Sequence, residues 1–114
     1  LSGVGNAADD RTLAADNNSF AVGLYQDLAI VPGNIFFSPY SASVSLGMAY
    51  EGARGQTAEQ MARTLRFKLP REKLAPAFAS LRQGITSSVG GKNRLLTANA
   101  LWPDNDFPML PEFT

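Results

Sequence analysis

No charged residue occurs from Ser38 to Tyr50, and the side chains there are apolar or small on every face of a helix. A helix without a polar face is typical of a protein interior. Ser38 can act as the N-cap, and Pro39 suits the first helical position, where a backbone N–H would lack a partner in any case. At roughly 1.5 Å per residue the helix is too short for a bilayer, which needs about 20 apolar residues. We therefore predict a buried central helix, around which the other segments pack.

The segment before the central helix predicts an amphipathic helix that ends at Leu28. The polar run at 16–19 offers several N-caps for it, and the chain breaks again around Pro32 and Gly33. Residues 1–15 are mostly small and polar, with Leu13 as an isolated later anchor, so we expect them to be mobile. The apolar residues that share one helical face are Phe20, Ala21, Leu24, Tyr25 and Leu28.

Two more helices are expected after the central one. Gly52 is a plausible C-cap for the central helix, and residues 57–60 match a capping box that opens a short helix through Leu65. The next helix carries a single apolar stripe, which requires Pro76 to lie in its first turn. The residues of this stripe are Leu74, Phe78, Leu81 and Ile85.

Two segments have the pattern of strands. Residues 35–37 form a short aromatic and aliphatic run, typical of a buried strand, although a loop is also compatible with so few residues. From Arg94 to Trp102 apolar residues alternate, and both faces are partly apolar, as in a strand covered on both sides. The first strand is too short to pair with the second, and an unpaired apolar strand favours aggregation. Leu110 onward resembles the first turn of a helix. We therefore expect the chain to be part of a larger α+β domain.

Composition narrows the function. The 114 residues are 45% hydrophobic and 18% charged, which is typical of globular proteins. Ten basic and ten acidic residues cancel, so net charge does not favour nucleic acid or a membrane surface as a partner. No apolar run is long enough for a signal peptide or a membrane helix. Because the chain has no His and no Cys, it cannot by itself supply a Ser-His-Asp triad, a cysteine nucleophile or an ordinary zinc site. An enzyme is therefore disfavoured.

Three candidate ligand motifs are weaker than simpler interpretations. Residues 90–92 suggest a phosphate loop, but Asn93 replaces the required Ser or Thr. Residues 104–106 suggest the opening of a calcium loop, but its glycine and closing glutamate are missing. We expect turns at both places, and no cofactor or metal. The scattered basic residues around the fourth helix are expected to form an ordinary solvated surface, and they are Arg71, Lys73, Arg82, Lys92 and Arg94.

The order of these segments resembles the serpin family of serine protease inhibitors. The specific parts are the run 34–41, Asn-Ile-Phe-Phe-Ser-Pro-Tyr-Ser, and the run 52–58, Gly-Ala-Arg-Gly-Gln-Thr-Ala. The runs 18–21 and 99–102 also fit, so the resemblance extends from about Asn18 to Phe113. It implies a single serpin domain of mixed α+β fold, of which residues 1–114 are the N-terminal part. Helices A to D, strand 6B at 35–37, strand 2A at 94–102 and the start of helix E would then lie in this chain.

The resemblance also implies a function. Serpins trap proteases by suicide, because the cleaved reactive loop inserts into sheet A as an extra strand. Asn34, Ser38 and Ser41 match the shutter region, which controls how the strands of that sheet part. Because a hydroxyl in an apolar helix needs a partner, we expect that of Ser41 to be buried and hydrogen-bonded. The reactive loop lies downstream in the family, so we expect this chain to be inactive alone and to need the rest of the fold.

The partner implied is a serine protease, with a cysteine protease as an alternative, and the resemblance favours an extracellular location. Two other hypotheses stay open at this point. One is a non-inhibitory serpin relative that acts as a carrier or chaperone. The other is an independent helical binding module.

Overall fold

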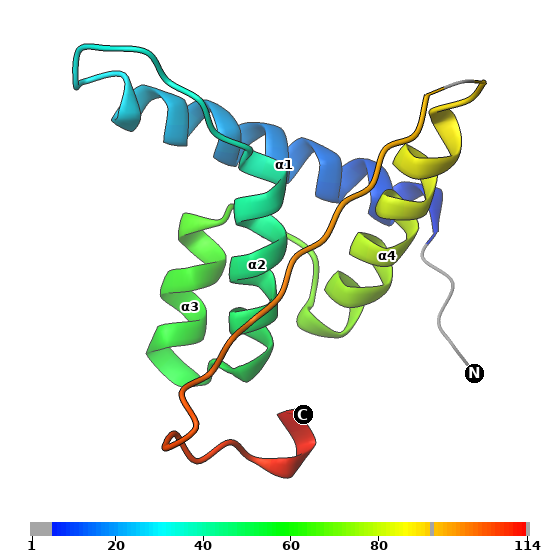
Figure 1. The fold of residues 1–114 in the computed structure, drawn as a ribbon. Helices are drawn as coiled ribbons and strands as arrows, with labels where there is room; N and C mark the ends of the chain where they lie inside the picture. The colour runs from blue at the N-terminus through cyan, green and yellow to red at the C-terminus, as the bar shows by residue number, and fades with distance from the viewer. Residues whose placement is uncertain (1–5, 92, 114) are drawn as a thin grey trace.

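The computed structural model describes residues 6–91 and 93–113. Helix α2 contacts α1, α3 and α4, as expected for the central helix. It is less buried than predicted, because Ser43, Gly47 and Tyr50 are its only buried residues and Leu46 is 44% exposed. In Figure 1, α1 crosses one end of the molecule, and α3 and α4 lie on opposite sides of α2. The described residues form four α-helices and one short 3-10 helix, with no strand. These elements are α1 (Ala7–Leu28), α2 (Pro39–Gly52), α3 (Gly55–Thr64), α4 (Arg71–Ser88) and η1 (Pro111–Phe113).

A small aromatic cluster is at the centre of the core. The Phe67 ring centroid lies 5.6 Å from that of Tyr50 and 5.9 Å from that of Phe78. Gly47 lets α2 approach this cluster closely, since a Cβ there would lie 3.3 Å from the Phe78 ring. The apolar stripe predicted for α4 is confirmed for Leu74, Phe78 and Leu81, which pack in or against this core. Ile85, the last residue of the stripe, is only partly buried and lies outside the core cluster. The buried apolar residues are Leu13, Phe20, Tyr50, Leu65, Phe67, Leu74 and Ala77.

Side chains bond the backbone groups that would otherwise be unpaired at the two ends of α2. Ser38 Oγ accepts a hydrogen bond from the Ser41 N–H at 3.2 Å, and Pro39 is the first helical residue, so both predictions are confirmed. Gly52 is the last helical residue, not the cap, which is Ala53. At this end Arg71 Nη1 donates to the carbonyls of residues 50 and 51, both at 2.9 Å. Its guanidinium also lies 4.4 Å from the Tyr50 ring centroid. Arg71 therefore joins the start of α4 to the end of α2.

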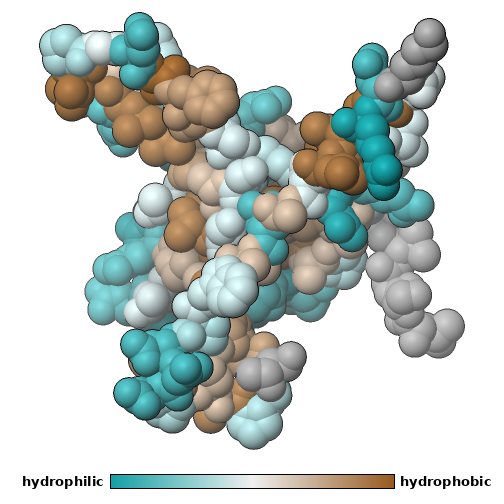
Figure 2. Space-filling view, in the orientation of Figure 1, coloured by the Kyte–Doolittle hydropathy of each residue, from teal (hydrophilic) through white to brown (hydrophobic). Residues whose placement is uncertain are grey.

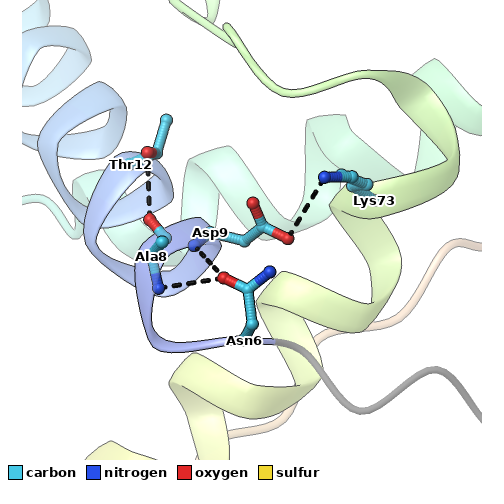
Figure 3. Close-up of polar contacts among 5 residues, drawn as sticks. All are labelled: Asn6, Ala8, Asp9, Thr12 and Lys73. Carbon is cyan, nitrogen blue, oxygen red and sulfur yellow. Dashed lines mark hydrogen bonds and ion pairs between the residues drawn. The ribbon is translucent and has the colours of Figure 1, made fainter.

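The predicted start of the first helix is wrong. Asn6 is the N-cap of α1, and its Oδ1 accepts from the backbone N–H groups of Ala8 at 2.9 Å and Asp9 at 2.8 Å (Figure 3). Lys73 Nζ of α4 lies 3.8 Å from Asp9 Oδ2 in the same view. Residues 7–15, which we expected to be loose, are therefore helical. Residues 1–5 lie outside the described residues.

Two details of the later helices also differ from the prediction. Helix α3 begins at Gly55 instead of after Thr57, and its N-cap Arg54 makes no side-chain cap hydrogen bond, so the capping box is not used. Gly55 has φ 55°, a left-handed conformation that glycine adopts without strain. Helix α4 begins at Arg71, which places Pro76 past the first turn. The carbonyl of Glu72, which the missing Pro76 N–H would have bonded, belongs to an exposed residue that water can reach.

The two expected strands are not formed. Phe36 is 104% exposed in the loop between α1 and α2. Residues 94–102 run as an extended segment past α2 (Figure 1), and no backbone–backbone hydrogen bond involves residues 93–103 within the described ranges. A strand is defined by pairing with a neighbour, and this part of the chain offers none. The described part is therefore helical, and the strand portion of the expected α+β fold is corrected here. The helix expected from Leu110 onward is the short η1, and Thr114 lies outside the described residues.

The molecule exposes more surface than a complete small domain. Its accessible surface is 8618 Å², whereas a folded monomer of this mass exposes roughly 6,100 Å². Its radius of gyration is 15.6 Å, against about 13.3 Å for a compact domain of this length. Figure 2 shows hydrophobic atoms gathered over the loop at one end of α1. The most exposed large apolar residues are Ile30, Val31, Phe36, Leu96 and Trp102.

Candidate functional site

Three serines form a stripe along α2. Ser38, Ser41 and Ser45 are spaced by three and then four residues, which places them on one side of the helix. The Ser45 hydroxyl donates to Asn99 Oδ1 of the extended segment at 3.3 Å, in a partly buried position. Figure 1 shows this segment crossing α2 obliquely on its way from the end of α4. Ser45, the last member of the stripe, therefore contacts the segment that we expected to be a strand.

Ser41 lies between the other two members of the stripe. It is partly buried, and within the described ranges its hydroxyl makes no hydrogen bond, although we expected it to be bonded. Ser38 uses its hydroxyl to cap α2. Asn34 is exposed in the loop before α2, and no hydrogen bond joins it to either serine in the part of the chain that the structure describes. The structure thus brings Ser38 and Ser41 together but leaves Asn34 apart.

Sequence reasoning missed two further buried polar residues, Asn17 on α1 and Ser43 on α2. Ser43 is 0% exposed, and Asn17 is buried at 9%. Neither Ser43 Oγ nor Asn17 Oδ1 has a hydrogen-bond partner among the described residues. Ser43 is two positions from both Ser41 and Ser45, so in a helix it lies on a different face from them. The alternation of serines could therefore have indicated a second polar face that is buried.

Asp16, which we expected to be a possible helix cap, has a different role. Its side chain is 1% exposed, and Oδ2 accepts a hydrogen bond from the Lys68 backbone N–H at 2.8 Å. Lys68 Nζ lies 3.8 Å from Oδ1, but that side chain is 76% exposed. The carboxylate therefore holds the connector between α3 and α4 against α1, mainly through the backbone contact.

This contact gives a prediction for the full-length protein. We expect Asp16→Ala to lower the free energy of unfolding by about 1–3 kcal/mol, because the Lys68 N–H loses its acceptor in a partly buried place. The matched control, Lys68→Ala, keeps that N–H and should cost less than about 1 kcal/mol, since it removes only an exposed charge. Urea unfolding of the two variants measures the difference. Equal losses would show that the side-chain ion pair is what matters.

The ionisable groups of the site are few. Burial raises the pKa of the Tyr40 phenol on α2, and the positive charge of Arg82 on α4 lowers it in part. The phenol is therefore neutral at pH 7 and can donate a hydrogen bond. Within residues 6–91 and 93–113, no three His, Cys, Asp or Glu side chains gather where they could hold a metal ion. None of the described helices combines the length and hydropathy needed to cross a membrane.

Comparison with known proteins identifies the family. The family model described as serpin (serine protease inhibitor) matches residues 15–114. A serpin-like protein of Thermococcus kodakarensis is 40% identical over 96 residues, which cover 84% of this chain and 22% of that protein. The leukocyte elastase inhibitor of Bos taurus is 40% identical over 103 residues, which cover 89% of this chain and 26% of that protein.

A third relative extends the match to more of the chain. A serine protease inhibitor of Mus musculus is 34% identical over 114 residues, covering 96% of this chain and 27% of that protein. The chain therefore spans about a quarter of the length of these curated relatives. No solved structure matches the chain. Since the family model covers most of the sequence and the relatives exceed 30% identity, the chain belongs to the serpin family.

Proposed function

We propose that the protein carrying this chain inhibits serine proteases, with cysteine proteases as alternative targets. Two of the relatives are named as inhibitors, one of leukocyte elastase and one of serine proteases. In this proposal a protease cleaves a reactive loop outside residues 1–114, and the loop inserts into a sheet next to residues 94–102. The protein acts as an inhibitor and not as an enzyme.

The observation that carries the proposal is the open backbone of residues 93–103. No backbone–backbone hydrogen bond involves these residues within the described ranges, and Leu96 and Trp102 are 74% and 90% exposed. An extended segment with free N–H and C=O groups and apolar side chains is suited to pair with strands on either side. The mechanism of the family requires a sheet that can accept one more strand.

We assign the shutter role to the serine stripe, with Asn34 joining it once the sheet is complete. The Ser45–Asn99 hydrogen bond supports this assignment, because it already links α2 to the segment that would become a strand. Ser41 lies one helical turn from Ser45 on the same side, and its hydroxyl is available for a group from the missing part of the protein. The stripe would then restrain how the strands above α2 separate.

A covalent-complex assay tests the proposal. We expect the full-length protein to form an SDS-stable adduct with an elastase-type or trypsin-like serine protease. The 114-residue chain alone should form none, because it has no reactive loop. A protease whose active-site serine has been blocked chemically is the control, and it should give no adduct with either protein, because the adduct is an acyl-enzyme.

The outcomes separate the hypotheses. Cleavage of the full-length protein by every protease tested, without any adduct, would show that it is not an inhibitor and would favour a carrier or chaperone role. An adduct with the 114-residue chain would show that the reactive site lies within this sequence.

A further inference from the structure

We propose that a groove between α1 and α3 binds a small organic anion with an apolar body. The groove has a volume of about 680 Å³ and is lined by residues of α1, the end of α3 and the connector that leads to α4. This volume lies in the range of small-molecule sites, roughly 300–1,000 Å³. Val22, Ala62 and Phe67 give the groove apolar surface, and the Phe67 ring is buried. An aromatic ring or a short acyl chain fits such a surface.

The charged residues that line the groove are all cationic. Arg63, Arg66 and Lys68 contribute to the lining, and no Asp or Glu does. Lys68 Nζ has Asp16 Oδ1 at 3.8 Å. Within the described residues, by contrast, the guanidinium groups of Arg63 and Arg66 make no ion pair and no hydrogen bond. Two unpaired guanidinium groups beside apolar surface favour a carboxylate, sulfate or sulfonate on an otherwise apolar molecule.

The backbone at Arg66 is a second and independent indication. Arg66 has φ 62°, and the other described residues with positive φ are all glycines, namely Gly33, Gly55 and Gly91. The Phe67 N–H donates to the Ala62 carbonyl at 2.9 Å, and the Arg66 N–H to that of Arg63 at 3.3 Å. These two bonds form a Schellman motif, whose left-handed position glycine fits best. An arginine at this position carries a conformational cost that glycine would avoid, which is consistent with a use for its side chain in binding.

The strain at Arg66 makes a discriminating variant. Arg66→Gly removes one cation and relieves the backbone at the same time, so the folded protein should unfold at the same temperature or higher. A purely structural role for Arg66 predicts the opposite, a loss of stability. Arg63→Gln provides a second variant that keeps the helix. The control is Arg94→Gln, which removes an exposed arginine outside the lining.

The experiment is a calorimetric titration of the full-length protein with naphthalene-2-sulfonate. We expect binding that is at least about tenfold tighter than that of neutral 2-naphthalenemethanol or of inorganic sulfate, since each lacks one half of the recognition. Arg66→Gly and Arg63→Gln should each weaken binding about tenfold, the effect of losing one charge-assisted contact. Arg94→Gln should bind as the wild type does.

Three results would overturn the proposal. They are no binding to the full-length protein, equal affinity for the neutral or the sulfate probe, and undiminished affinity of both groove variants. The test is independent of protease inhibition, because the groove is formed entirely by residues 18–68 and needs no reactive loop. A protein that inhibits no protease could still bind the anion, and an active inhibitor could fail to bind it.

Discussion

Purified on its own, the 114-residue chain should aggregate or remain molten. A chain of this mass exposes roughly 17,700 Å² when unfolded and about 6,100 Å² in a complete fold. With 8618 Å² still accessible, the chain buries only about half of its unfolded surface, whereas a complete domain of this size buries about 65%. Net stability is the small difference between the free energy gained by burying surface and the conformational entropy lost on folding. The smaller buried surface of this chain therefore leaves too little net stability for a cooperative fold.

Thermal unfolding followed by circular dichroism, together with side-chain NMR, measures this expectation. The helices should be detectable in the far ultraviolet while the side-chain signals stay broad and the melt lacks a sharp transition. Under the proposed function, the rest of the protein added as a separate polypeptide should restore a sharp melt, because it would cover the exposed residues Phe36 and Trp102. A cooperative melt of the monomeric chain alone, with dispersed side-chain signals, would show that residues 1–114 fold independently.

Ser41→Leu in the full-length protein should shift it towards loop-inserted latent or polymeric forms. Ser41 lies one helical turn before Ser45, which bonds Asn99 of the extended segment. The Ser41 hydroxyl makes no hydrogen bond among the described residues, but under the proposed function it bonds a group elsewhere in the protein. Losing that bond would cost about 1–3 kcal/mol, and overpacking by leucine adds about 1–3 kcal/mol. The total stability of a protein is roughly 5–15 kcal/mol. The native form must bear this cost without the stabilisation that an inserted strand provides. The loop-inserted form has that extra strand, so it should tolerate the leucine better.

Polymer formation on mild heating and the number of inhibitor molecules consumed per protease molecule are the two measurements. Ser87→Leu is a matched control, because Ser87 is exposed near the end of α4 and its hydroxyl bonds only the Gly84 carbonyl of its own helix. That variant should behave as the wild type does. If Ser41→Leu also leaves both quantities unchanged, the shutter role of the serine stripe is wrong.

The sequence predicts the central helix and the α4 stripe because both depend on local patterns. Ser38 and Pro39 determine where α2 begins, and Leu74 leads a stripe at helical spacing. The start of α1 was missed because Asp16 and Asn17 look like caps in a one-dimensional pattern. In the structure both are buried, and Asp16 meets the Lys68 backbone N–H, 52 positions along the chain. Hydropathy alone cannot show that a carboxylate will be buried against a distant N–H.

The two predicted strands are not formed for a different reason. The alternation from Arg94 to Trp102 describes which faces a strand would present, and it carries no information about whether a neighbour is within reach. The serine stripe was only partly predicted. Ser38 and Ser41 came from the family resemblance, whereas Ser45 could have been found from its helical spacing to them.

The open backbone of residues 93–103 has a consequence for synthesis in the cell. A ribosome adds about 5–20 residues per second, so each further hundred residues takes about 5–20 s. Under the proposed function, strands made later in the chain are the ones that cover this segment. Until they emerge, Leu96 and Trp102 are accessible to chaperones and to other nascent copies of the protein. The yield of active protein would then depend on the speed of translation as well as on the stability of the finished fold.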